Sequence, residues 1–260
     1  MENNKRNLGV PIAIVIAGLL VAGAIYLGQS KSGPVSVTPP NETATAYQLN
    51  KLEPVKQSEH VRGNKEAKIV LVEYSDLECP FCKMFHWSME EIMKKYGDQI
   101  AWVYRHYPLD CNGGTIPGCR TLHAKARKEA EAAECVAELG GETKFWEYVD
   151  KIFAITPSND GLDAAELPKI AKAIGVDETK FNQCLMGGKH ATAIQADNDN
   201  GNEIGVDGTP FVVLLAPGDI RLQVLRAPLP DNANALTKEI MSALNAEQQK
   251  SYQKLLEEQN

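Results

Sequence analysis

Two cysteines separated by two residues form the motif with the clearest chemistry in this chain. Cys79 and Cys82 belong to a C-P-F-C run between an apolar segment that predicts a strand, 69–74, and an amphipathic pattern that predicts a helix over 79–96. Unpaired N–H groups and the helix dipole stabilise an anion at a helix N-terminus. We therefore expect Cys79 to be exposed, with a lowered pKa, and Cys82 to lie within disulfide reach on the same face. A redox-active dithiol is favoured over a static disulfide or half of a zinc site.

The composition sets the class of protein. The chain has 260 residues, of which 43% are apolar, so it can bury a sizeable core. Its formal net charge is −7 and it has no long basic run, so nothing indicates a nucleic-acid partner. Its six cysteines, an even number, fit an oxidising compartment if the chain is exported.

The N-terminal residues predict export. Residues 8–28 carry no charge and would span ~31 Å as a helix, enough to cross a bilayer core. Lys5 and Arg6 precede them, which places the N-terminus in the cytoplasm and the rest outside. We expect an uncleaved signal-anchor. The alternative is a signal peptide cleaved near Ala24. Residues 29–55 are polar and proline-containing, which predicts a linker from the membrane to the folded domain.

The remaining periodicity predicts an α/β fold. Strands at 69–74 and 100–106 flank the cysteine helix as a parallel βαβ unit. A helical signal fills 121–202, after which come a hairpin and a C-terminal helix. The economical arrangement is a mixed sheet with helices on both faces, interrupted by an all-helical insertion. The expected helices of the insertion are 122–139, 144–154, 163–174, 177–186 and 189–198, the hairpin strands are 210–215 and 220–225, and the last helix is 231–256.

Several motifs, in their order and spacing, resemble the DsbA-like thiol–disulfide oxidoreductases, including membrane-anchored bacterial members. They are Glu59-His-Val-Arg-Gly-Asn64, Val-Glu-Tyr-Ser-Asp before Glu-Cys-Pro-Phe-Cys-Lys83, Tyr104-Arg-His-Tyr-Pro-Leu109, Ala-Ala-Glu-Cys135 with Lys-Phe-Trp-Glu-Tyr148, and Gly205-Val-Asp-Gly-Thr-Pro-Phe211. The resemblance implies a thioredoxin-like fold. With it, the chain divides into an N-terminus and anchor (1–28), a linker (29–55), a first thioredoxin part (56–107), a loop and helical insertion (108–203) and a second thioredoxin part (204–256).

The resemblance also implies roles for individual residues. Cys79 matches the attacking cysteine and Cys82 the resolving one. Thr209-Pro210 matches a cis-proline loop whose backbone can pair with an extended substrate. The alternative is an ordinary trans proline opening a strand.

A buried acid is implied as well. Glu73 matches a carboxylate that can take the proton of Cys82, and Arg105 lies near the position of a basic partner for it. The alternative is that both side chains point to solvent. The spacer Pro80-Phe81 departs from the Pro-His of the best-known oxidants, which leaves the oxidising strength open. His86, one turn on, could supply a cation or could be an exposed helix residue.

Four further cysteines predict two structural disulfides, Cys111–Cys119 and Cys135–Cys184. By loop entropy these would stabilise the fold by at most ~2.5 and ~4 kcal/mol. Other pairings, a free Cys135 and a second redox pair at 111 and 119 stay open.

The function expected from these residues is introduction of disulfides into exported proteins by a membrane-anchored, extracytoplasmic enzyme. Its substrates would be unfolded or newly exported cysteine-containing proteins. The resemblance suggests reoxidation by a quinone-linked membrane protein of DsbB or VKOR type, and it implies no cofactor and no metal. The alternatives are a reductase or isomerase of the same fold, a holdase, and a zinc-stabilised binding module using Cys79, Cys82, Cys111 and Cys119, whose C-x7-C half fits zinc poorly.

Overall fold

The computed structural model describes residues 47–114, 119–216, 219–224 and 242, all of which belong to the unit Ala46–Asn260. The predicted anchor, 8–28, and all of the predicted C-terminal helix, 231–256, except residue 242 lie outside these residues. Among the residues described, no helix is long and apolar enough to cross a membrane.

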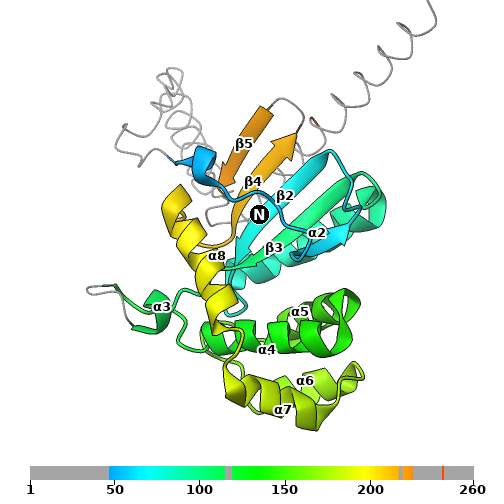
Figure 1. Cartoon of the computed structure of the whole chain (residues 1–260), viewed down its shortest axis with the longest axis vertical. Helices are drawn as coiled ribbons and strands as arrows, with labels where there is room; N and C mark the ends of the chain where they lie inside the picture. Colours follow the sequence, from blue (N-terminus) through cyan, green and yellow to red (C-terminus); the bar gives the residue numbers. More distant parts are fainter. Residues whose placement is uncertain (1–46, 115–118, 217–218, 225–241, 243–260) are drawn as a thin grey trace, which may run out of the picture. The chain divides into compact units, whose positions relative to one another are not determined.

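A five-stranded mixed sheet forms the centre of the unit (Figure 1). Strands β2 and β3 run parallel, with Ile69 opposite Ile100 and Ser75 opposite His106, and the other neighbours are antiparallel. The βαβ unit and the hairpin predicted from the sequence are therefore confirmed. In spatial order the strands are β1 (His60–Gly63), β3 (Ile100–His106), β2 (Ile69–Ser75), β4 (Phe211–Ala216) and β5 (Asp219–Val224).

The helices follow the predicted order with shifted ends. The predicted fold class, a thioredoxin-like α/β fold with a helical insertion, is confirmed. In Figure 1, α4 to α7 lie together at one end of the unit. The bounds are η1 (Leu49–Lys51), α2 (Pro80–Tyr96), α3 (Cys111–Gly114), α4 (Ala126–Gly140), α5 (Glu142–Ile155), α6 (Glu166–Ala173), α7 (Glu178–Gly187) and α8 (Ala191–Ile204).

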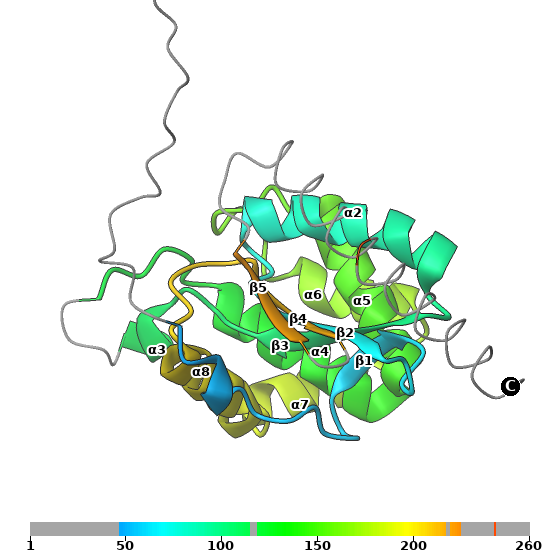
Figure 2. The same ribbon diagram turned by 90° about the horizontal axis from the view of Figure 1, so that it is seen from above.

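Strand alternation gives the sheet two different buried faces. Leu71 and Trp102 share one face with Phe85 of α2 and the core of the insertion. Val72 and Val103 face the other way, where Ile204 of α8 covers them. Figure 2 shows α2 and α8 on opposite sides of the sheet. The last predicted helix of the insertion thus serves as a covering layer of the thioredoxin sheet.

Residues 47–53, predicted to be linker, are part of the folded unit. The Tyr47 ring lies 5.3 Å from Phe211, centroid to centroid, and the Gln48 N–H donates to the Ile204 carbonyl. These contacts cover apolar surface of β4 and α8 that a solvated linker would leave exposed. The linker therefore ends earlier than the composition indicated.

Aromatic packing fixes the insertion against the sheet. The Trp102 and Trp146 ring centroids are 4.9 Å apart, and Phe145 contacts both Trp146 and Tyr104 edge to face. Each such pair contributes about 0.5–1.5 kcal/mol beyond area burial. The aromatic side chains of α5 are therefore part of the core, and they hold the insertion against the sheet.

Candidate active site

Cys79 is the N-cap residue of α2, and Pro80 is the first residue of the helix. Cys79 has extended backbone angles, φ −79° and ψ 122°, and its carbonyl accepts the first helical hydrogen bond from the Lys83 N–H at 3.1 Å. The free N–H groups of the first helical turn therefore lie next to the Cys79 sulfur. Cys79 and Cys82 are thiols in this structure. The strand-to-helix placement expected of a redox dithiol is the one observed.

The prediction that Cys79 is exposed is wrong: the residue is 3% accessible and belongs to the core cluster. The turn before it, residues 76–78, is buried because the insertion folds over it. The Asn159 N–H donates to the Glu78 carbonyl at 2.8 Å, and the Gly161 N–H donates to a Glu78 carboxylate oxygen. A substrate therefore has to approach Cys79 past this cover. Phe81 is the more exposed residue of the motif, at 36%.

The two thiols are electrostatically unequal. A hydrogen bond from the Cys82 thiol, together with the Cys82 backbone N–H, lowers the pKa of Cys79 to about 6, against the opposing effect of burial. Burial and the neighbouring Cys79 raise the pKa of Cys82 well above its ordinary value. At neutral pH, Cys79 is the thiolate and Cys82 keeps its proton. Because of this difference in pKa, Cys79 is the sulfur that exchanges with the substrate. As a thiolate it attacks a substrate disulfide, and in the oxidised protein a substrate thiolate attacks it.

The loop before β4 lies against the dithiol. The Thr209–Pro210 peptide bond is cis, as predicted, and the Cys79 sulfur lies 3.4 Å from the Thr209 carbonyl oxygen, to which it donates while it is protonated. Pairing of β4 with β2, which sets Phe211 opposite Tyr74, fixes where this loop emerges. The Tyr107 hydroxyl holds its other side by donating to the Val206 carbonyl at 3.2 Å. A backbone edge is thus held beside the reactive sulfur.

Glu73 is fully buried beneath the dithiol, on the same face of the sheet as Trp102. The Trp102 indole N–H donates to one carboxylate oxygen at 2.8 Å, and the other oxygen has no hydrogen-bond partner among the described residues. Burial raises the pKa of Glu73 to about 8. The Glu73 charge in turn raises the pKa of Cys82. Glu73 therefore has the burial and the proton affinity of a group that exchanges a proton near neutral pH.

Arg105 does not pair with Glu73, so that expectation is wrong. Successive side chains of a strand point to opposite faces, and Arg105 lies on the face covered by α8. Its guanidinium donates to both Glu59 oxygens, to the Tyr74 hydroxyl and to Asn200. Arg105 is a buried structural cation that ties the segment before β1 to the sheet.

His86 is neither exposed nor next to the thiolate. It is 1% accessible, and its Nε2 lies 2.7 Å from Asp150 Oδ1. Asp150 also accepts two hydrogen bonds from Arg62. His86, Asp150 and Glu90 are residue types that bind metals, and their ligand atoms lie within 4.8 Å of one another. The guanidinium already neutralises the shared carboxylate, so the arrangement is that of an ion-pair network joining α2 to α5.

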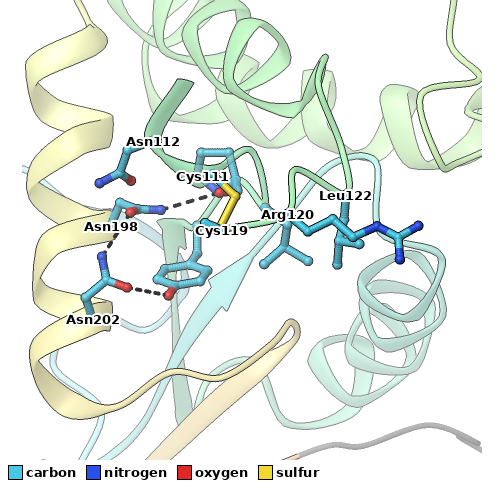
Figure 3. Close-up of a pocket in the computed structure, with 10 residues that line it drawn as sticks. Cys111, Asn112, Cys119, Arg120, Leu122, Asn198 and Asn202 are labelled. Atoms are coloured by element: carbon cyan, nitrogen blue, oxygen red, sulfur yellow. Dashed lines mark hydrogen bonds between the residues drawn. A yellow bond between two sulfur atoms is a disulfide. The ribbon is translucent and has the colours of Figure 1, made fainter. Parts of the chain in front are cut away.

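The other four cysteines form the disulfides Cys111–Cys119 and Cys135–Cys184, which are the predicted pairs. The second joins α4 to α7. The first lines a cavity of about 230 Å³ beside α8, where Asn198 and Asn202 take part in the hydrogen bonds drawn in Figure 3. Because Cys111 and Cys119 are bonded to each other, the zinc site built from four cysteines is ruled out.

Sequence reasoning missed Asp76 and His123. Asp76 is 2% accessible, and its N–H donates to Cys82 Sγ at 3.4 Å. His123 Nδ1 lies 3.0 Å from Asp76 Oδ2. Asp76 could have been noticed in the turn between strand and motif. His123 gives no local signal, because it follows Cys82 by 41 residues in an irregular segment.

Comparisons with known proteins agree with this geometry. The family model described as Thioredoxin matches residues 56–215, which include the dithiol, the insertion and the cis-proline loop. The chain belongs to the thioredoxin family. Among solved structures, DsbA2 of Pseudomonas aeruginosa is similar at 25% identity and a TM-score of 0.54, covering 74% of this chain and 96% of that protein. Wolbachia pipientis α-DsbA1 has the same fold at 21% identity and a TM-score of 0.56, covering 76% of this chain and 96% of that protein.

The DsbA-like assignment made from the sequence is thereby confirmed. Curated relatives carry another name. The Na(+)/H(+) antiporters NhaA 1 of Mycolicibacterium vanbaalenii and NhaA 3 of Salinispora tropica are each 32% identical, over 62% and 71% of this chain. The chain spans about a quarter of the length of these proteins, 24% of each. The antiporter name describes those whole proteins.

Proposed function

We propose that this DsbA-like chain is an oxidant, which introduces disulfides into exported cysteine-containing proteins through Cys79 and Cys82. The observation that carries the proposal is the unequal pair of thiols. A dithiol whose reduced form is stabilised gives up electrons reluctantly and accepts them readily, which makes its disulfide oxidising. The stabilised Cys79 thiolate, with a pKa of about 6, supplies that preference.

The reaction balances over two exchanges. A substrate thiolate attacks Cys79 Sγ in the Cys79–Cys82 disulfide, forming a mixed disulfide and releasing the Cys82 sulfur as a thiolate. Glu73, protonated below its pKa of about 8, gives Cys82 its proton. A second substrate thiolate then attacks the substrate sulfur of the mixed disulfide and releases the Cys79 thiolate. Two electrons have passed to the enzyme, and the substrate has gained a disulfide.

The size of the oxidising effect follows from the Cys79 pKa. Relative to a thiol with an ordinary pKa of ~8.5, one with a pKa of about 6 stabilises the reduced form about tenfold at pH 7. Tenfold in this two-electron equilibrium is about 30 mV. We expect the potential to exceed by at least this amount that of the same chain with an unperturbed Cys79.

The reduction potential, measured by equilibration with glutathione buffers, tests the oxidase assignment. We expect a value well above the roughly −270 mV of thioredoxin. A value at or below that level would contradict the oxidase and favour the reductase. Cys79→Ser should abolish oxidation of a reduced peptide, whereas a holdase would keep its activity. Cys82→Ser cannot form the Cys79–Cys82 disulfide, so it should be given an oxidised peptide instead. Its Cys79 thiolate attacks the peptide disulfide and releases one peptide thiolate, and the mixed disulfide accumulates because no Cys82 thiol displaces it. Wild-type protein with blocked thiols is the matched control.

We also propose that the catalytic unit works outside the cytoplasm, anchored by residues 8–28 and reoxidised by a quinone-linked protein of DsbB or VKOR type. Support comes from the uncharged N-terminal run after Lys5 and Arg6, and from two disulfides remote from the dithiol, which fit an oxidising compartment. Protease added to intact cells with a permeable outer layer should degrade the unit. Full protection, with the protein in the soluble fraction, would contradict the proposal.

A further inference from the structure

Asp76 is a buried carboxylate held beside the dithiol by the backbone. Its Oδ1 accepts from the Glu78 N–H at 2.7 Å and its Oδ2 from the Leu109 N–H at 2.8 Å. Its own N–H donates to Cys82 Sγ at 3.4 Å. These bonds fix the strand-to-helix turn, so the carboxylate cannot turn away from the sulfurs.

A fixed negative charge in this place opposes thiolate formation. Asp76 acts to raise the pKa of Cys79 and that of Cys82. Its side chain is fully inaccessible to solvent, so water does not screen it. The site therefore requires a nearby positive charge if Asp76 is not to weaken the Cys79 thiolate.

His123 lies in position to provide that charge. Its Nδ1 is 3.0 Å from Asp76 Oδ2, its side chain is 7% accessible, and its N–H donates to the Leu109 carbonyl. The next two backbone N–H groups, of Ala124 and Lys125, donate to Asp160 in the loop after α5. Hydrogen bonds to Asp76 from the ring, and to Leu109 and Asp160 from the backbone, therefore fix His123 between the active-site turn and the loop after α5.

The ionisation of His123 is linked to the dithiol. Burial lowers its pKa, but the hydrogen bond and charge of Asp76, the Cys79 charge and a contact with Asn159 outweigh burial and raise the pKa to about 9. Asp160 also faces this segment, where it accepts from the two backbone N–H groups, and Lys125 Nζ donates to the Asp160 carbonyl at 2.7 Å. Near Asp76, burial together with the neighbouring Glu78 and Asp76 raises the pKa of Glu129 to about 10, so Glu129 adds no charge at neutral pH. His123 is therefore a cation at neutral pH, and its interaction with Cys79 is favourable when Cys79 is a thiolate.

We propose that His123 is a positioning residue that neutralises Asp76 and thereby allows Cys79 to ionise. The Asp76 carboxylate organises the backbone of the turn by accepting its N–H groups. Because His123 neutralises this carboxylate, Asp76 does not destabilise the Cys79 thiolate as an unpaired carboxylate would. The Pro80-Phe81 spacer carries no charge of its own, so the compensating cation comes from the insertion, and the insertion tunes the reactivity of the thioredoxin part.

The test is the pH dependence of Cys79 alkylation in the reduced full chain, with the adduct located by mass spectrometry. His123→Asn should raise the pKa of Cys79 by roughly one pH unit, the lower end of the effect of a nearby charge. At pH 6 this lowers the thiolate fraction from about half to about a tenth, so alkylation slows about fivefold. The double variant Asp76→Asn/His123→Asn should return the pKa to the wild-type value or below.

His190→Asn is the matched control, because His190 also pairs with a carboxylate, Glu138 at 2.9 Å, in an exposed place on the insertion. The pKa of Cys79 in the His190→Asn protein should equal that in the wild type. A folded His123→Asn protein with an unchanged Cys79 pKa would overturn the proposal, as would a double variant whose pKa stays as high as that of the single one.

A measurement on the unaltered chain covers the case in which the variants do not fold. Coupling between two ionisable groups is reciprocal. The His123 ring pKa, followed by NMR, should be higher in the reduced protein, which has the Cys79 thiolate, than in the oxidised protein. Equal values would overturn the proposal. The inference rests on the dithiol of the proposed function but not on its direction, because a reductase potential would leave both pKa comparisons in force.

Discussion

Glu73→Gln should make the protein more stable and less active. Burial raises the pKa of Glu73 from about 4.5 to about 8. Glutamine has nearly the same shape and keeps an oxygen for the Trp102 indole N–H, which donates to Glu73 at 2.8 Å. The substitution therefore removes the titration while retaining the hydrogen bond. The increase in the free energy of unfolding measures how much the buried acid destabilises the fold.

The sign and size follow from linkage. Between pH 4.5 and 8 the folded state holds a proton on Glu73 that the unfolded state has lost, so the contribution of Glu73 to stability falls as pH rises through this window. At pH 7 the difference amounts to about 2.5 pH units, or about 3 kcal/mol at 1.36 kcal/mol per unit. Glu73→Gln should match the wild type near pH 4 and exceed it by about 3 kcal/mol at pH 7.

Urea denaturation of both proteins at pH 4, 5.5, 7 and 8 measures this difference. Stopped-flow oxidation of a reduced peptide measures the loss of proton transfer, which should slow the exchange by ~10²–10⁴-fold. A variant that gains no stability at pH 7 would show that Glu73 titrates normally. A variant that gains stability but keeps full activity would show that Glu73 does not carry the proton of Cys82.

Three other perturbations test the packing around the site. The carboxylate neighbours of His60 outweigh burial and raise its pKa to about 9. The protein should therefore lose about 3 kcal/mol of stability as pH rises from 6.5 to 9, and His60→Gln should flatten this pH profile in denaturation curves. Replacing Cys135 and Cys184 by alanine should cost up to ~4 kcal/mol in the same assay without moving the Cys79 pKa, and an unchanged midpoint would refute the entropic account. Gly201→Ala should destabilise by ~1–3 kcal/mol, because a Cβ there meets the Tyr107 ring at 2.6 Å, whereas Gly187→Ala, with open space around it, should be neutral or stabilising by thermal melting.

Local sequence patterns predict most of the fold and identify the reactive sulfurs. The strand, the C-P-F-C run and the helix are contiguous, so period and spacing place Cys79 at a helix start without tertiary information. The hairpin of β4 and β5 is equally local. The cis-proline loop was reached through the family resemblance, because the residues themselves were compatible with a trans bond.

Features set by distant parts of the chain were not predictable. Cys79 is covered and His86 is buried because the insertion folds over α2, and neither residue type nor period shows where an insertion will lie. Strand β1 is only four residues long, too short for a periodic signal. The helix expected over 163–174 begins later, at Glu166, because the Asp163 side chain accepts from the Ala165 N–H and forms a turn instead. His123 becomes part of the site only through tertiary contact.

The alkylation of Cys79 as a function of pH tests the central claim most directly. Reduced wild-type protein is treated with iodoacetamide for short times between pH 4 and 10, and the modified cysteine is identified by mass spectrometry. The geometry predicts a midpoint near 6, with the adduct on Cys79 and Cys82 protected throughout. A midpoint above 8, or an adduct that appears first on Cys82, would contradict a helix-stabilised thiolate at Cys79.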